Sequence, residues 1–313
     1  MTIPRQLVSR ATQLFNGRAT FGPYEAGKPG LQVHLLYRWK PERNLSTTFT
    51  AGVAAGATSA TLSAAWAGAT GLFPITFSDG ETLRGKFLNG NTAVTFYPAS
   101  APATGGTYGA LTGPQVAVTS AIVVGQQPPV VGVANSVAAS QSINTGTPGL
   151  VNGALATAGV ATMDVPRNIV AAWTGTAILT VTGTDYYGQT QTEASASGTS
   201  FTGKKAFATI TAISVSANVT AATVGTGNAL GLPFMVANSA DFFAPVFDGA
   251  ADAAAAATNL IVADNTNPAT STSGDVRGTY LPAGTLNGAK FLAALIKVYD
   301  NTTQVGSFGV TPA

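Results

Sequence analysis

Ile178-Leu-Thr-Val-Thr182 is followed by the turn cluster Gly183-Thr-Asp-Tyr-Tyr-Gly188 and then by Gln189-Thr-Gln-Thr-Glu193. A further run, Ala206-Phe-Ala-Thr-Ile-Thr-Ala-Ile-Ser-Val-Ser216, comes after a loop rich in Ser and Gly. In these runs β-branched residues alternate with small polar residues, and Gly and Asp bound them, which is typical of half-buried antiparallel strands. No helical period of 3.6 residues competes with this alternation. The alternation changes phase between Ile210 and Ile213, which predicts a β-bulge.

Short strand-like runs separated by turn residues continue from this stretch to the C-terminus. Further strands are expected at 219–224, 259–263 and 290–299, whereas Gly225-Thr-Gly-Asn-Ala-Leu-Gly231 is interpreted as a turn. The alanine-rich run at 252–259 fits either one helical turn or a strand. Many short strands with frequent turns indicate an all-β fold, with a β-sandwich or jelly-roll-like main body over residues 127–313.

Residues 45–126 are expected to form a separate, small β-meander module. Asp79-Gly80 and Asn89-Gly90 supply the positive φ angles of tight hairpin turns, and apolar residues alternate in the runs around them. The three strands would be 75–78, 83–87 and 93–96, with one shared apolar face. Because a lone meander is marginally stable, we expect it to pack on strands from 49–66. Gln126-Gln-Pro-Pro129 is interpreted as a linker at the module boundary.

Residues 1–44 are interpreted as a basic N-terminal arm. A short helix is predicted at 4–15 and a strand near 31–39. The arm holds seven basic and two acidic residues, a net charge of +5, leaving eight basic and eleven acidic residues, a net charge of −3, for the rest. Such asymmetry suggests that the arm and the body meet different surroundings and that the arm serves for docking, although the helix could equally cap the chain's own core. The candidate docking residues are Arg5, Arg10, Arg18, Arg38, Lys40, Arg43, Phe15 and Trp39.

The composition argues against an enzyme. Only 9% of the residues are charged and there is no Cys, so thiolate catalysis and Cys-based zinc sites are excluded. His34 is the single histidine, and no nucleophile motif accompanies it. Lys204-Lys205 is interpreted as a solvated pair, and the spacing of Asp241, Asp248 and Asp252 matches no calcium loop. We therefore expect no cofactor, no metal, no nucleic-acid binding and no membrane span, in a protein made in a cytoplasm.

The second half of the chain also carries motifs with a fairly specific order and spacing over residues 160–300. They are Asp164-Val-Pro-Arg-Asn168, Leu179-Thr-Val-Thr-Gly-Thr-Asp185 with Tyr187-Gly-Gln189, Ser197-Gly-Thr-Ser-Phe-Thr-Gly-Lys-Lys-Ala-Phe207, Val224-Gly-Thr-Gly227, Leu230-Gly-Leu-Pro-Phe234 and Gly274-Asp-Val-Arg-Gly-Thr-Tyr280. This part resembles a family of tailed-phage virion structural proteins that decorate or cement the head. The stretch from Phe77-Ser-Asp-Gly-Glu81 to Asn89-Gly-Asn-Thr-Ala-Val-Thr95 looks like a small β module of phage virion proteins.

The resemblance implies a structural protein that decorates and stabilises the phage capsid. Its expected partners are the major capsid protein and copies of itself, as a homotrimer on the virion capsid surface, assembled in the host cytoplasm. The alternative is a receptor- or glycan-binding module of a head fibre or tail, in which exposed rings such as Tyr186-Tyr187 stack on host-surface glycans. A glycan hydrolase is a distant third, because it would need a carboxylate pair in a groove.

Overall fold

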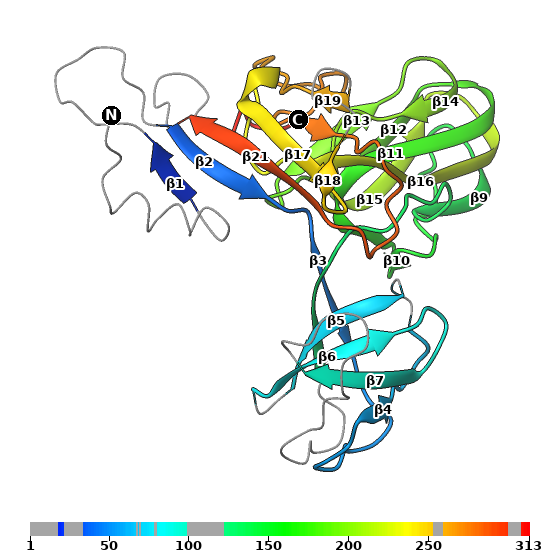
Figure 1. The fold of residues 1–313 in the computed structure, drawn as a ribbon. Coiled ribbons are helices and arrows are strands. Elements are labelled where there is room, and N and C mark those ends of the chain that lie inside the picture. Colours follow the sequence, from blue (N-terminus) through cyan, green and yellow to red (C-terminus); the bar gives the residue numbers. More distant parts are fainter. Residues whose placement is uncertain are drawn as a thin grey trace. The chain divides into compact units, whose positions relative to one another are not determined.

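The computed structural model describes residues 18–21, 34–66, 68, 70–77, 80–98, 122–252, 259–299 and 308–313. It is an all-β protein built from antiparallel sheets, as predicted, and Figure 1 shows its strands. The helix predicted at 4–15 lies outside the described residues. The chain divides into a main body (1–41, 131–285 and 292–313) and a small unit (42–130 and 286–291). Within the described ranges no helix is long and apolar enough to cross a membrane.

The first sheet of the main body has ten described strands. Its order is β13-β12-β15-β11-β16-β20-β19, while β10 and β14 also pair with β11, and β9 pairs with β16. The strands are β9 (Ala138–Ile143), β10 (Ala156–Thr157), β11 (Val160–Ala177), β12 (Leu179–Thr184), β13 (Thr190–Ala194), β14 (Gly198–Thr202), β15 (Phe207–Val215), β16 (Val219–Gly231), β19 (Leu260–Ile261) and β20 (Thr279–Tyr280).

The long strand β11 curls this sheet by changing partners along its length. Its first part pairs with β15 up to Arg167, and its second part pairs with β14 from Val170 onward, while β16 follows it from Arg167 to Thr174. The curled sheet encloses the principal core, which includes Ile169, Leu179, Val181, Phe207 and Ile210. The body is therefore sandwich-like, with alternate residues of β12 facing inward.

The β-bulge predicted between Ile210 and Ile213 is confirmed. Thr182 of β12 lies opposite Ala212, but the next residue, Gly183, lies opposite Ile210, so Thr211 is the extra residue in β15. In contrast, the turn predicted at 225–231 is wrong, because these residues continue strand β16. A side chain on Gly225 would collide with the backbone oxygen of Val133, so glycine there permits a close approach of two backbones.

A second, five-stranded sheet of the main body has the order β1-β2-β21-β17-β18. Strand β2 pairs with β21 along its whole length, from His34 opposite Tyr299 to Trp39 opposite Ala294, and the two run side by side in Figure 1. Residues 34–39 are thus part of the body's sheet, whereas the sequence suggested an arm over 1–44. The strands are β1 (Arg18–Phe21), β2 (His34–Trp39), β17 (Phe242–Phe247), β18 (Ala250–Ala251) and β21 (Leu292–Tyr299), and the 3₁₀ turn η2 (Ser239–Asp241) precedes β17.

The small unit is a six-stranded sheet with the order β3-β8-β5-β6-β7-β4. The predicted meander is present as β5, β6 and β7, and the turn residues Gly80 and Gly90 have positive φ angles. Its apolar face packs with Phe49 and Leu62, which form a β-bridge, as expected. The strands are β3 (Arg43–Thr47), β4 (Ser59–Thr61), β5 (Gly71–Thr76), β6 (Thr82–Phe87), β7 (Ala93–Pro98) and β8 (Ile122–Gln127).

The linker predicted at 126–129 is partly a strand. Gln126 and Gln127 belong to β8 and lie opposite Asn44 and Arg43 of β3. The boundary between the units falls at 130/131, close to the position near 126 that the sequence suggested. The linker prediction rested on composition, because two glutamines before two prolines are typical of an exposed linker. In the structure Gln127 is fully buried.

Candidate functional site

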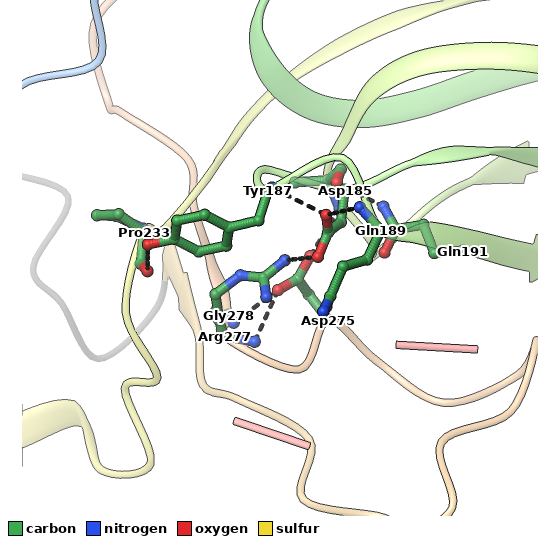
Figure 2. A network of polar contacts seen from close by, with 9 residues as sticks. Asp185, Tyr187, Gln189, Gln191, Pro233, Asp275, Arg277 and Gly278 are labelled. Atoms are coloured by element: carbon green, nitrogen blue, oxygen red, sulfur yellow. Dashed lines mark hydrogen bonds and ion pairs between the residues drawn. The ribbon is translucent and has the colours of Figure 1, made fainter. Parts of the chain in front are cut away.

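A buried ion pair in the main body connects the turn after β12 to the segment before β20. Asp185 is completely buried, and its Oδ2 atom lies 2.5 Å from a guanidinium nitrogen of Arg277. Its Oδ1 atom accepts hydrogen bonds from the backbone N–H groups of Tyr187 and Gln189, both at 2.8 Å. One carboxylate thus fixes the turn that carries Tyr186 and Tyr187 and also compensates the charge of Arg277 (Figure 2).

Asp275 and Tyr187 complete this network on either side of Arg277, as Figure 2 shows. Asp275 accepts from the backbone N–H groups of Arg277 and Gly278 through Oδ1, and from that of Ala206 through Oδ2. Burial raises the pKa of Asp275, while the Arg277 charge and these three donors oppose the rise. The guanidinium of Arg277 lies 5.1 Å from the ring centroid of Tyr187, whose hydroxyl donates to the carbonyl of Pro233 at 2.6 Å.

A second pair of buried charged residues consists of Glu193 in β13 and Lys205, which follows β14. Lys205 donates through Nζ to the backbone oxygens of Thr192, Thr270 and Ala313 at 2.8–3.1 Å, and only 1% of it is exposed. The prediction that Lys204-Lys205 is a solvated pair is therefore wrong for Lys205. Burial lowers the pKa of Lys205, and burial raises that of Glu193 to about 7. Both shifts follow from removing a charged group from water.

Arg167 and Asn168 of β11 form a third buried polar group. Arg167 makes a salt bridge of 2.7 Å with Asp164 and also donates to the carbonyl of Gly227. Asn168 donates to the carbonyl of Gly203 and accepts from the N–H of Ala229, both at 3.0 Å. These contacts link β11 to β16 and to the end of β14. The three polar groups together hold the turns and strands of the body by charge-assisted hydrogen bonds.

An aromatic cluster covers the turn that Asp185 fixes. Tyr186 and Tyr187 have ring centroids 5.1 Å apart, and Tyr187 meets Phe308 edge-on at 5.3 Å. Phe308 contacts Phe234 at 5.6 Å, and Phe234 contacts Tyr37 of β2 at 4.9 Å. Phe234 is buried and Tyr37 half-buried, whereas Tyr186, Tyr187 and Phe308 are 38%, 46% and 48% exposed. We call the three exposed rings the aromatic row.

The outer face of the second sheet has a shallow apolar hollow of about 290 Å³. Leu36 and Arg38 of β2 line one part of it, and Leu295 of β21 lies opposite Arg38 in the register. On the other side, Val246 of β17 lies opposite Ala293. Arg38 is half-exposed there, so its charge stands at the border of an apolar surface.

The structure separates the residues that the sequence suggested for docking. Arg38 and Lys40 are half-exposed, and Arg43 lies in β3, where its guanidinium is 3.4 Å from the side-chain oxygen of Gln127. Trp39 is a correction: it is 2% exposed, and its indole packs against Phe242 and Tyr280 in the core. Arg38 and Trp39 are successive residues of strand β2, so their side chains lie on opposite faces of the sheet and that of Trp39 faces the core. Arg18 lies in β1, and Arg5, Arg10 and Phe15 lie outside the described residues.

The acidic residues weighed as a cation site have other partners. Asp252 accepts from the hydroxyl of Tyr280 at 2.9 Å, and Asp241 lies 3.6 Å from the ammonium of Lys297. In the part of the chain that the structure describes, no three His, Cys, Asp or Glu residues are grouped so that they could hold a metal ion.

Sequence reasoning noticed Tyr186-Tyr187 but missed the rest of the aromatic cluster. Tyr37, Phe234 and Phe308 lie far from this pair in the chain, and only the pairing of β2 with β21 and the path after β16 bring them together. No local pattern signals such an assembly. Comparison with protein-family models, curated proteins and solved structures finds no match to the chain.

Proposed function

We propose that this chain is a structural protein of a tailed-phage particle, without enzymatic activity, which docks on the capsid as a homotrimer and stabilises the shell. The observation that carries the proposal is where the motifs of the resemblance lie. Separate motifs contribute the residues concerned, namely Asp164, Arg167 and Asn168 from the first, Asp185 from the next, then Lys205, and finally Asp275 and Arg277. In the fold they supply the buried polar contacts of the main body.

Buried charged groups of this kind favour one fixed arrangement of the segments they connect. A charge left without its partner in the core costs several kcal/mol, so alternative packings of these turns are disfavoured. A protein that braces a shell needs such a defined shape, because its contacts with the lattice depend on surfaces that keep their form. Closed threefold symmetry would present the same surface three times and add avidity.

The surface we propose for docking is the outer face of the second sheet, together with the basic segment that precedes it. Arg38 stands beside Leu36 and Leu295, so the face combines an apolar area with a positive charge at its border. Interfaces commonly have this composition, with an apolar centre and Arg enriched. The major capsid protein would meet this face with an apolar surface and an acidic group.

Capsids assembled without this chain provide the test. Purified chain should sediment with them in a saturable manner, raise the temperature at which they release their contents, and have a solution mass of three times the 31.3 kDa chain. Arg38→Glu should weaken co-sedimentation at least tenfold. Lys86→Glu is the control, because it also replaces a positive by a negative charge, but at an exposed position of the small unit. This variant should bind as the unchanged protein does.

Two results would contradict the proposal. One is absence of co-sedimentation with capsids that lack the chain. The other is a copy number of a few per particle, located at one vertex by electron microscopy, since decoration of a shell requires copies distributed over its lattice.

A further inference from the structure

Tyr187, the central ring of the aromatic row, is held in place before any partner arrives. Asp185 fixes the backbone of the turn through two N–H groups, and the hydroxyl of Tyr187 is tied to the carbonyl of Pro233. Arg277 lies against one face of the Tyr187 ring and is itself fixed by Asp185 (Figure 2). Rings immobilised in this way lose little conformational entropy on binding a ligand, which is the basis of preorganised recognition.

The size of the row favours a small ligand over a protein surface. With about 150–250 Å² for each aromatic side chain, exposures of 38–48% leave roughly 200–300 Å² of ring surface open. A specific protein–protein interface buries about 800 Å² on each partner. The row alone therefore matches a ligand of a few rings better than a second copy of the chain.

The charge of the site favours a neutral ligand. The cation of the cluster, Arg277, is 2% exposed and paired with Asp185, so it presents no free charge to a ligand. The phenol of Tyr186 stays protonated, because burial raises its pKa and nearby Tyr37 raises it further, while the Arg277 charge opposes the rise. It therefore offers a neutral hydroxyl, both donor and acceptor, at the edge of an apolar surface.

We propose that the row formed by Tyr186, Tyr187 and Phe308 binds a neutral carbohydrate chain. Sugar rings have apolar C–H faces and hydroxyl edges, which matches ring faces bordered by a phenol. The centroid spacings of 5.1 and 5.3 Å resemble the length of one pyranose unit, and the angles of 56° and 88° between neighbouring ring planes mean that a sugar chain would meet some rings by their faces and others by their edges. This carbohydrate site is separate from the proposed docking face, which lies on the outer side of the second sheet.

The test uses the full chain and four neutral probes, namely cellohexaose, maltohexaose, mannohexaose and chitohexaose, at millimolar concentration. Saturation-transfer NMR should show contact with the C–H faces of at least one probe, and titration gives its affinity. Tyr186→Ala and Phe308→Ala should each weaken binding about tenfold, or about 1.4 kcal/mol. Tyr186→Trp keeps an aromatic face and should retain binding.

Phe291→Ala is the matched control, because Phe291 is an equally exposed ring, at 47%, but belongs to the small unit. It should leave carbohydrate binding unchanged. Circular dichroism and the unfolding midpoint of each variant establish that a loss of binding does not come from a loss of folding.

Absence of saturation transfer from all four probes would overturn the carbohydrate site, as would binding that Tyr186→Ala and Phe308→Ala leave unaltered. If these variants instead lose co-sedimentation with capsids, the row is a protein-docking surface and the inference is wrong. Since Arg38→Glu is the variant that tests capsid docking, failure of the carbohydrate site and failure of the proposed function give different results.

Discussion

Replacing Glu193 with glutamine tests how the main body responds to pH. The Glu193 side chain is 4% exposed, and its Oε1 atom accepts from the N–H of Lys204 at 2.6 Å. Its Oε2 atom is buried without a hydrogen-bond donor in the described part of the chain and lies against Gly203. Burial raises the pKa to about 7, opposed by the N–H groups of Lys204 and Lys205 and by the Lys205 charge, while Asp275 adds to the rise.

The magnitude follows from the difference between the folded and unfolded pKa values. A rise of the pKa from its ordinary value of 4.5 to about 7, at 1.36 kcal/mol for each pKa unit, corresponds to about 3 kcal/mol. The folded protein keeps the proton at pH values where the unfolded chain has lost it. The free energy of unfolding therefore contains this contribution in full below about pH 4.5, and loses it as the pH rises through 7.

Glu193→Gln keeps a side-chain oxygen that accepts the hydrogen bond from the N–H of Lys204. The glutamine side chain, however, has no proton to lose in this pH range. We expect the free energy of unfolding of Glu193→Gln, minus that of the unchanged protein, to increase by about 3 kcal/mol between pH 4.5 and 8. Taking the difference cancels the groups that titrate equally in both proteins. Urea denaturation at half-unit pH intervals measures it.

Thr199→Ser is the control, because Thr199 is an exposed residue of the same unit and neither side chain of this exchange titrates between pH 4.5 and 8. For this pair the difference should stay constant within about 0.5 kcal/mol. A pH-independent difference for Glu193→Gln would refute the reasoning, and so would a decrease with rising pH.

Three further changes test the packing, each by urea denaturation. Arg277→Ala leaves the Asp185 carboxylate buried without its cation and should lower the free energy of unfolding by about 3–5 kcal/mol. Gly183→Ala places a methyl group 1.9 Å from a backbone oxygen of β15 and should cost at least about 1–3 kcal/mol, whereas Gly198→Ala enters open space and should change stability by less than about 0.5 kcal/mol. Phe87→Ala empties the core of the small unit and should cost about 3–5 kcal/mol, and a loss below 1 kcal/mol would contradict that packing.

Features set by neighbouring residues were predictable from the sequence. The turns at Gly80 and Gly90 depend on local backbone angles, and the bulge at Thr211 shows in the alternation of β15 itself. The all-β class follows from the same signals repeated along the chain. In each case a short segment contains all the residues that determine its conformation.

Features that depend on distant partners were not predictable. Trp39 follows Arg38 in a basic stretch, and only the pairing of β2 with β21 shows that the indole faces the core. The sequence predicts that Lys205 lies in solvent, because nothing near it in the chain indicates the three backbone oxygens that accept from its ammonium group. These oxygens belong to distant segments. Similarly, the sequence contained the Tyr pair of the aromatic row, but not its contact with Phe308.

The pairing of β2 with β21 also bears on how the protein is made. His34 and Tyr299 lie opposite each other although they are 265 positions apart in the chain (299 − 34). During synthesis, the segment His-Leu-Leu-Tyr-Arg-Trp leaves the ribosome long before β21, so its pairing with β21 must form after nearly all of the chain has been made. We therefore expect a slow final folding phase, and a nascent chain with an unpaired strand edge that chaperones would shield until translation is complete.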